Sequence, residues 1–297
     1  MKKISCSIGV IVFNEAANIG KLLEALLHQE SELVSVAEII VVSSACTDGT
    51  DDIVREYEKK ESCIKLITEA TRGGKSSAIN KFIAAAKSEI LIIESGDTIP
   101  DKDTVEKLIM PFADEKIGMT GGRPVPENEP STFIGYAVNL LWNLHHQMAL
   151  KSPKLGEMVA FRRIFRQLPP ESAVDEASIE AIIKEKGFEL KYIPDAIVHN
   201  KGPENIGDFI KQRRRIEAGH LWLKQYQNYE VTSQNHLLLL ELAVQEIKRE
   251  PAKIHFLIGT AWLEFCSRLL GMYDFKIKKK NPFQWDIAGT TKKLDRF

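Results

Sequence analysis

The sequence CSIGVIVFNE (residues 6–15) decides how the chain is expected to fold. The apolar, β-rich run from Cys6 to Phe13 predicts a buried strand, which ends at the polar pair Asn14-Glu15. The run and the two lysines before it faintly resemble a signal peptide, but serines interrupt the run and no small-residue cleavage site follows. We therefore expect the first strand of a folded domain.

After this strand, apolar runs of strand length alternate with segments that carry apolar residues at helical spacing. The expected strands are Glu38–Val42, Ile64–Ile67 and Ile90–Ile93, and the expected helices are Ala17–His28, Thr50–Lys60 and Ser76–Lys87. This alternation predicts an α/β fold with a parallel sheet that is covered by helices on both faces. Ligands of such sheets bind beyond the carboxyl ends of the strands, so the loops at those ends are the first candidates for function.

The second half of the chain is less regular. The Gly- and Pro-rich stretch Gly121–Pro130 predicts a break in regular structure. Beyond it, the pattern predicts helices at about Tyr136–Leu150, at Asp175–Lys186, from near Gly207, and over much of His236–Tyr273, with short strands at Leu190–Ile193 and Ala196–Val198.

Composition excludes several classes of protein. The chain of 297 residues has 40 basic and 41 acidic side chains, so it lacks the basic surplus that general nucleic-acid binding requires. Its four cysteines are scattered without a CxxC pair, which argues against a zinc site or a disulfide framework and fits a reducing cytoplasm. No apolar run reaches the ~20 residues of a membrane-spanning helix.

The loops after successive strands carry residues suited to a nucleotide. Asn14-Glu15 can hydrogen-bond a base or a ribose, and the small-residue turn Ser43–Thr50 lets a ligand approach the backbone. Lys75 at a helix N-terminus can neutralise a diphosphate, whereas Glu94 and Asp97 are oxygen ligands that suit Mg²⁺ or Mn²⁺. Each segment alone also fits a helix cap, a solvated lysine or a turn acid, but together they predict a nucleotide diphosphate site.

With these segments in order, the chain resembles the family 2 glycosyltransferases, inverting enzymes of the GT-A fold, from about Ser5 to His220. The family's Tyr-Asn-Glu is Phe13-Asn14-Glu15 here, its Asp-Asp-Gly-Ser-Thr-Asp turn is SSACTD (residues 43–48), and its Gly-Lys-x-x-Ala-x-Asn is GKSSAIN (residues 74–80). Asp97 is the best match to its Asp-x-Asp metal motif. Its acidic pair corresponds to Asp175-Glu176, and its Gln-x-x-Arg-Trp to QRRRI (residues 212–216).

This resemblance implies an α/β, mostly parallel GT-A fold and the inverting, metal-assisted transfer of a sugar from a nucleotide-sugar to an acceptor hydroxyl. Glu176 falls at the general-base position by its spacing from Gly187, with Asp175 as its immediate rival. The implied donor-binding residues are Val12, Asn14, Glu15, Ser44, Lys75, Asp97, Gln212 and Arg215. Mg²⁺ or Mn²⁺ would be held by Asp97, Glu94 and His199.

The chain also departs from the family's pattern. Ser44 stands where many members place a base-binding Asp, two residues instead of one separate Glu94 from Asp97, and Ile216 replaces the Trp associated with processive enzymes. These differences leave the nucleobase open and weaken a polymerase interpretation.

We expect a GT-A domain at residues 1–225 and a helical C-terminal extension at residues 226–297. The nucleotide-sugar half would span about 1–110 and the acceptor half about 111–225. Apolar segments of the extension lie near the basic run Lys276–Lys280, which favours either a peripheral contact with the inner face of the cell membrane or a helical lid or dimer interface. The acceptor would be a saccharide or a lipid-linked molecule.

Two other classes of protein stay open. A nucleotidyltransferase would also use a metal and a nucleotide, but it would usually carry a Gly-rich phosphate loop where Phe13-Asn14-Glu15 stands. A Walker A loop at Arg72–Ser76 is excluded because Glu69 occupies the position of its first glycine. The altered metal motif also fits a non-catalytic protein that binds nucleotide-sugars on the same fold.

Overall fold

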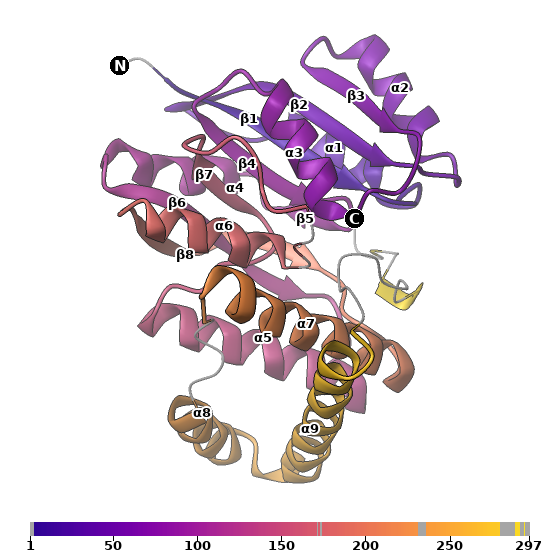
Figure 1. Cartoon of the computed structure of the whole chain (residues 1–297), viewed down its shortest axis with the longest axis vertical. Coiled ribbons are helices and arrows are strands. Elements are labelled where there is room, and N and C mark those ends of the chain that lie inside the picture. The colour runs from indigo at the N-terminus through magenta and orange to yellow at the C-terminus, as the bar shows by residue number, and fades with distance from the viewer. Residues whose placement is uncertain are drawn as a thin grey trace.

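The computed structural model describes residues 3–170, 172, 174–230, 236–279, 289–291 and 294, without the side chains of 236–240. One sheet forms the centre of the molecule (Figure 1), with its strands in the order β3-β2-β1-β4-β7-β6-β8-β5. The strands are β1 (Ile4–Val12), β2 (Val34–Ser44), β3 (Ile64–Glu69), β4 (Ile90–Ser95), β5 (Thr98–Pro100), β6 (Ile117–Pro126), β7 (Val159–Arg162) and β8 (Glu189–Asn200).

Strands β3, β2, β1 and β4 are parallel, which confirms the α/β prediction. The helices between them are α1 (Ile19–Leu27), α2 (Thr50–Lys60) and α3 (Lys75–Ala85). Ile8 and Val10 of β1 pack into the same core as Leu22 and Leu23 of α1, whereas Ile11 packs with α3 on the opposite face. Because alternate strand residues point to opposite faces, burial of both faces explains the continuous apolar run of β1.

A bare glycine sets the distance between β1 and α3. A Cβ atom on Gly9 would lie 2.5 Å from the ring of Phe82, which is fully buried. The absence of a side chain therefore lets α3 lie close to the sheet, and the N-terminus of α3 reaches the edge where the parallel strands end.

The stretch Gly121–Pro130 was expected to break regular structure, and this prediction was wrong for its first part, because β6 continues through Pro126. A Cβ atom on Gly121 would lie 2.7 Å from Leu155, and one on Gly122 would lie 2.7 Å from the carbonyl oxygen of Ala196. These glycines thus allow close packing inside a strand. The sheet is mixed in this half, because β7 is antiparallel to β4 and β6, and β5 is antiparallel to β8.

The two short strands expected at Leu190–Ile193 and Ala196–Val198 are parts of the single strand β8. Its pairing with β6 is irregular in the middle, where Gly121 is opposite Tyr192 and Arg123 is opposite Ile197. Pro194 lies in this interruption, where its missing N–H breaks no ladder hydrogen bond.

The remaining helices cover the β6–β8 half and extend beyond it (Figure 1). They are α4 (Thr104–Ile109), α5 (Phe133–Lys151), α6 (Asp175–Glu185), α7 (Ile206–Gln227), α8 (His236–Arg249) and α9 (Ile254–Lys276). The helical region expected from His236 to Tyr273 is divided by a turn at Pro251–Lys253. No helix in the described parts of the chain is both long enough and apolar enough to span a bilayer.

Helix α9 packs along α7, and ion pairs join the two helices. Arg213 of α7 contacts Glu264 of α9 through two hydrogen bonds of 2.6 Å, and Arg214 contacts the buried Asp274 at 2.5 Å. Because both carboxylates are partly or fully removed from water, these charge-assisted contacts hold α9 in a defined register on α7.

Candidate functional site

A cavity of about 630 Å³ begins at the carboxyl ends of β1, β2 and β4 and continues between α5, α7 and α9. Most of the residues predicted for the site lie on its wall: Val12, Glu15, Ser44, Lys75, Asp97, Asp175, Glu176, Gln212 and Arg215. They come from both halves of the chain. Three other predicted residues, Asn14, Glu94 and His199, are absent from the wall.

Helix α3 holds the acidic pair of α6 in place. The hydroxyl of Ser76 lies 2.5 Å from Oδ1 of Asp175 and 2.9 Å from the carbonyl oxygen of Ser172. Further along α3, Asn80 donates to the carbonyl of Leu168 at 3.0 Å and accepts from its N–H at 2.6 Å. The polar positions of the GKSSAIN motif thus clamp the chain segment that leads into α6.

The acid–base pair at the centre of the cavity is Lys75 and Glu176. Nζ of Lys75 lies 2.6 Å from Oε1 of Glu176. Burial opposes the charge of both groups, but the negative charges of Glu176 and Asp175 raise the pKa of Lys75, and Lys75 in turn lowers the pKa of Glu176. The pair is therefore ionised and mutually neutralised.

Asp175 has a different environment, since only 3% of its surface is exposed. Burial raises the pKa of Asp175, and the neighbouring charge of Glu176 acts in the same direction. A protonated Asp175 can donate to the Ser76 hydroxyl, which leaves the single proton of Ser76 for the Ser172 carbonyl.

Carboxylates crowd together beside this pair. Glu157 lines the cavity in a left-handed backbone conformation (φ 56°), and its Oε1 accepts a hydrogen bond of 3.2 Å from Asn200. Burial, with the nearby charges of Asp97 and Glu176, raises the pKa of Glu157 to about 7. Asp97 accepts no hydrogen bond from any residue that the structure describes.

This arrangement fits a divalent cation, because a cation would relieve the repulsion and carboxylate oxygens are the ligands that Mg²⁺ and Mn²⁺ prefer. Asp97 and Glu157 are the residues placed to hold one. Within the described ranges, no three His, Cys, Asp or Glu side chains form a ready metal-binding group.

Asn14 and Glu94 make contacts that are structural. Asn14 has a left-handed backbone (φ 54°), its Oδ1 accepts from the N–H of Thr47 at 2.8 Å, and its own N–H donates to Sγ of Cys46 at 3.1 Å. It therefore ties two strand-end loops together. Glu94 is 1% exposed, and its Oε1 accepts from the Thr98 hydroxyl while its Oε2 has no partner among the described residues. Burial raises its pKa, which favours the neutral form over a metal-binding carboxylate.

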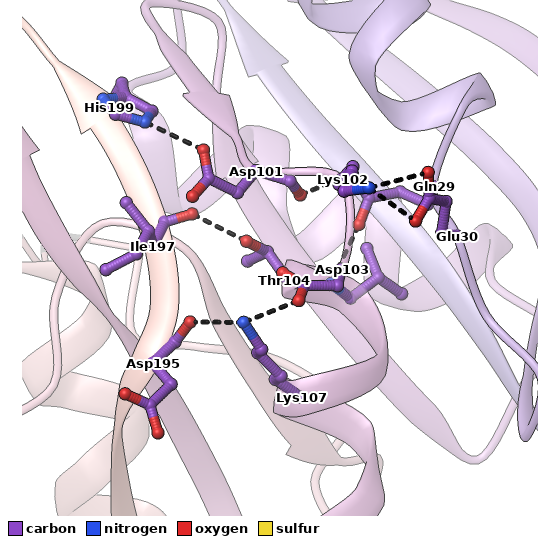
Figure 2. A network of polar contacts seen from close by, with 11 residues as sticks. Gln29, Glu30, Asp101, Lys102, Asp103, Thr104, Lys107, Asp195, Ile197 and His199 are labelled. Atoms are coloured by element: carbon purple, nitrogen blue, oxygen red, sulfur yellow. Dashed lines mark hydrogen bonds and ion pairs between the residues drawn. The ribbon is translucent and has the colours of Figure 1, made fainter.

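His199 faces away from the cavity. Its Nε2 lies 2.9 Å from Oδ1 of Asp101, at the corner between β5 and α4 (Figure 2). The next residue of β8, Asn200, lines the cavity, and successive strand residues point to opposite faces. In this structure Asn200, rather than His199, is the residue of this pair that lines the cavity.

The outer end of the cavity has features of a nucleobase site that sequence reasoning in part missed. The guanidinium of Arg72 lies 4.2 Å from the centre of the Phe13 ring, and both residues line the cavity. Ser44 donates to Oε2 of Glu69 at 2.6 Å, and Glu69 also binds Ser77 and Lys81. Burial acts to raise the pKa of Glu69, but these hydrogen bonds outweigh it and lower the pKa. An ionised carboxylate therefore lies directly behind Ser44.

The inner end of the cavity also lay beyond sequence reasoning. Its polar residues come from α5, the loop before β7, α7 and α9, and they are His145, Lys154, Arg213, His220, Glu264 and Arg268. Lys154 lies in a loop and the other five residues are spread over three helices, so no local sequence motif joins them.

We expect Glu157→Gln to stabilise the ligand-free protein above pH 7. The folded-state pKa of Glu157 is raised, so its contribution to stability is complete below the unfolded pKa of about 4.5 and is lost as the pH rises through about 7. The variant should raise Tm by a few degrees at pH 8 and leave it unchanged at pH 4.5, since about 1 kcal/mol shifts Tm by roughly 2–4 °C in domains of this size. Calorimetry at the two pH values measures this. Equal Tm shifts at pH 8 and pH 4.5 would contradict this prediction. The same Tm shift in the exposed control Glu189→Gln would also contradict it.

The mixed sheet and its strand-end cavity define an α/β domain of the GT-A class. The chain belongs to glycosyl transferase family 2, whose model matches residues 7–169. The fold is shared with the mannosyltransferase PcManGT from Pyrobaculum calidifontis, solved with GDP-Man and Mn²⁺ (TM-score 0.68, 19% identity, 94% of this chain and 89% of that one). It is also shared with glucosyl-3-phosphoglycerate synthase from Mycobacterium tuberculosis, solved with Mn²⁺, UDP and phosphoglyceric acid (TM-score 0.53, 18% identity, 74% of this chain and 78% of that one).

Among curated relatives, a probable glycosyltransferase YdaM of Bacillus subtilis is 27% identical over 63% of this chain and 48% of its own length. A poly-beta-1,6-N-acetyl-D-glucosamine synthase of Staphylococcus epidermidis is 24% identical over 70% of this chain and 53% of its own length. The chain therefore spans about half the length of the curated relatives it matches.

Proposed function

We propose that the chain transfers a sugar from a nucleotide-sugar to an acceptor hydroxyl with inversion at the anomeric carbon. The observation that carries the proposal is that one cavity joins the strand-end loops to the acidic pair, with Lys75 and Glu176 in contact at 2.6 Å. The nucleotide would lie over β1 and β2, near Val12, Glu15 and Ser44. Gln212 and Arg215 of α7 would close over the diphosphate.

In this account the donor itself prepares the base. The diphosphate attracts Lys75 away from Glu176, so the pKa of Glu176 rises toward the value that suits a general base. Glu176 then takes the proton of the acceptor hydroxyl while the acceptor oxygen forms its bond to the anomeric carbon. The bond from that carbon to the phosphate oxygen breaks, and its electron pair leaves with the nucleoside diphosphate.

The leaving diphosphate requires positive charge. A divalent cation, when bound, would supply Lewis-acid stabilisation of that charge. Asp97 and Glu157, which both line the cavity, would hold it, and Lys75 and Arg215 would contribute positive charges of the chain's own. Both cations already act on the acidic pair, because Lys75 and Arg215 each oppose the rise in the pKa of Asp175.

The experiment that tests the proposal is nucleotide-sugar turnover. We expect nucleoside diphosphate to be released from at least one donor with Mn²⁺ and not with a chelator. Pyrophosphate release or nucleotidyl transfer would instead favour the nucleotidyltransferase alternative. Binding of a donor without any turnover would favour the non-catalytic binder.

We further propose a cytoplasmic enzyme that rests on the inner face of the membrane through α9. The outer side of α9 and the C-cap residue that follows it carry an apolar stripe at helical spacing. Every member is at least 44% exposed: Ile254, Ile258, Trp262, Phe265, Leu269, Tyr273 and the C-cap Ile277. Lys276, Lys278 and Lys279 adjoin it, which complements an anionic surface. At low salt, phosphatidylserine vesicles should carry the protein into the pellet on sedimentation. Protein that stays in the supernatant would contradict this contact.

A further inference from the structure

The inner end of the cavity has more positive than negative charge. Lys154, Arg213 and Arg268 line it, and Glu264 is the one acid on the wall at that end within the described residues. Glu264 already binds Arg213 at 2.6 Å and Arg268 at 2.9 Å, so it neutralises at most one of them.

The acids behind the wall do not correct this imbalance. Glu180 accepts from the N–H of Leu155 at 2.6 Å and from the Tyr229 hydroxyl at 2.9 Å, and burial raises its pKa to about 7. Burial likewise raises the pKa of Glu217, which Glu264 also repels. Glu180 therefore carries less than a full negative charge near neutral pH.

Of the three cations at the inner end, Lys154 is the one without a partner among the described residues. Among the residues that the structure describes, it forms neither a hydrogen bond nor an ion pair. Burial and the positive charges of Arg213 and Arg268 lower its pKa to about 8, and the opposing effects of Glu180 and Glu264 do not offset them. His145 lies nearby with 7% of its surface exposed, and its Nδ1 has no partner within the described chain.

Part of the wall of the same cavity is apolar. Helices α5 and α9 supply it, with Leu140, Leu141, Leu144, Leu257 and Ala261. A molecule with an anionic group and an apolar portion would therefore find cations for the first and these leucines for the second in one cavity.

We infer that the acceptor is a phosphate ester with an apolar chain, and that its phosphate binds Lys154, Arg213 and Arg268. A phosphate has the charge and the acceptor oxygens to pair with lysine and arginine together. This inference rests on the proposed function, because it treats the inner end of the cavity as the acceptor site.

Octyl phosphate is a direct probe, with octyl glucoside as its neutral counterpart and inorganic phosphate as its chain-free counterpart. We would measure binding by titration calorimetry below the critical micelle concentration. Octyl phosphate should bind at least about 10-fold more tightly than octyl glucoside or inorganic phosphate. Lys154→Met should weaken that binding by roughly 10-fold or more, since it removes a charge-assisted contact. Lys151→Met is the matched control, because Lys151 is exposed and pairs with Glu241 on the surface.

Nucleoside diphosphate binding with Mn²⁺, measured on the same samples, separates the two claims. Octyl phosphate that binds no better than octyl glucoside, or that binds Lys154→Met and wild type alike, overturns the inference and leaves the donor proposal intact. Octyl phosphate that binds through Lys154 while the wild type binds no nucleoside diphosphate overturns the donor proposal and, with it, the assignment of the phosphate ester as an acceptor. Should Lys154→Met fold poorly, Lys154→Gln replaces it, with the same expected loss.

Discussion

Glu176→Gln should lower kcat for sugar transfer by roughly 10²–10⁴-fold, the usual contribution of a general base. The amide keeps the size of the side chain but cannot take a proton from the acceptor. Since the variant also frees Lys75 from its 2.6 Å ion pair, donor affinity should stay the same or become tighter. Single-turnover transfer and donor titration measure the two effects separately.

Glu185→Gln is the control, because Glu185 is an exposed acid at the end of the same helix. Asp175→Asn tests the rival base. We expect it to lower Tm as well as activity, since Asp175 is buried against Ser76. A Glu176→Gln enzyme with kcat within 2-fold of wild type would remove Glu176 from the mechanism.

Asp97→Asn should weaken Mn²⁺-dependent donor binding by more than about 100-fold, because even the residues behind a metal's direct ligands typically contribute 10–100-fold to its affinity. Donor binding in the presence of a chelator should be equally weak in the variant and in the wild type. Calorimetric titration of the donor with and without Mn²⁺ measures this directly.

The exposed Asp195→Asn is the control for a general loss of negative charge. Glu94→Gln and His199→Ala test the other two predicted ligands, and we expect smaller losses because neither residue lines the cavity. A loss in His199→Ala equal to that in Asp97→Asn would require His199 to turn from Asp101 toward the metal.

The parallel half of the fold followed from local patterns in the sequence. Apolar runs such as Cys6–Phe13 are buried on both faces, and that burial leaves a signal that needs no knowledge of the rest of the chain. The strand-end rule then brought Lys75 and Asp97 to the same cavity, although they are 22 positions apart in the sequence.

The antiparallel part and the inner end of the site depend on distant partners. Strand β7 has four residues, and its strand character comes from the neighbours β4 and β6. Likewise Glu94, His199 and Asn14 have the right chemistry, but their directions are set by the Thr98 hydroxyl, by Asp101 and by the loop at Cys46. Lys154 became a candidate only when the packing of α7 and α9 placed arginines beside it.

The central claim is that this cavity binds a nucleotide-sugar through Asp97 and its metal. The most direct measurement is a thermal-shift titration of wild type and Asp97→Asn with a panel of nucleotide-sugars, in Mn²⁺ and in a chelator. We predict that at least one donor raises Tm of the wild type in Mn²⁺ by several degrees, since ligand at 100 times Kd adds about 2.7 kcal/mol. The shift should vanish in the chelator and in Asp97→Asn. No shift with any donor, or the same shift in Asp97→Asn, would contradict the account.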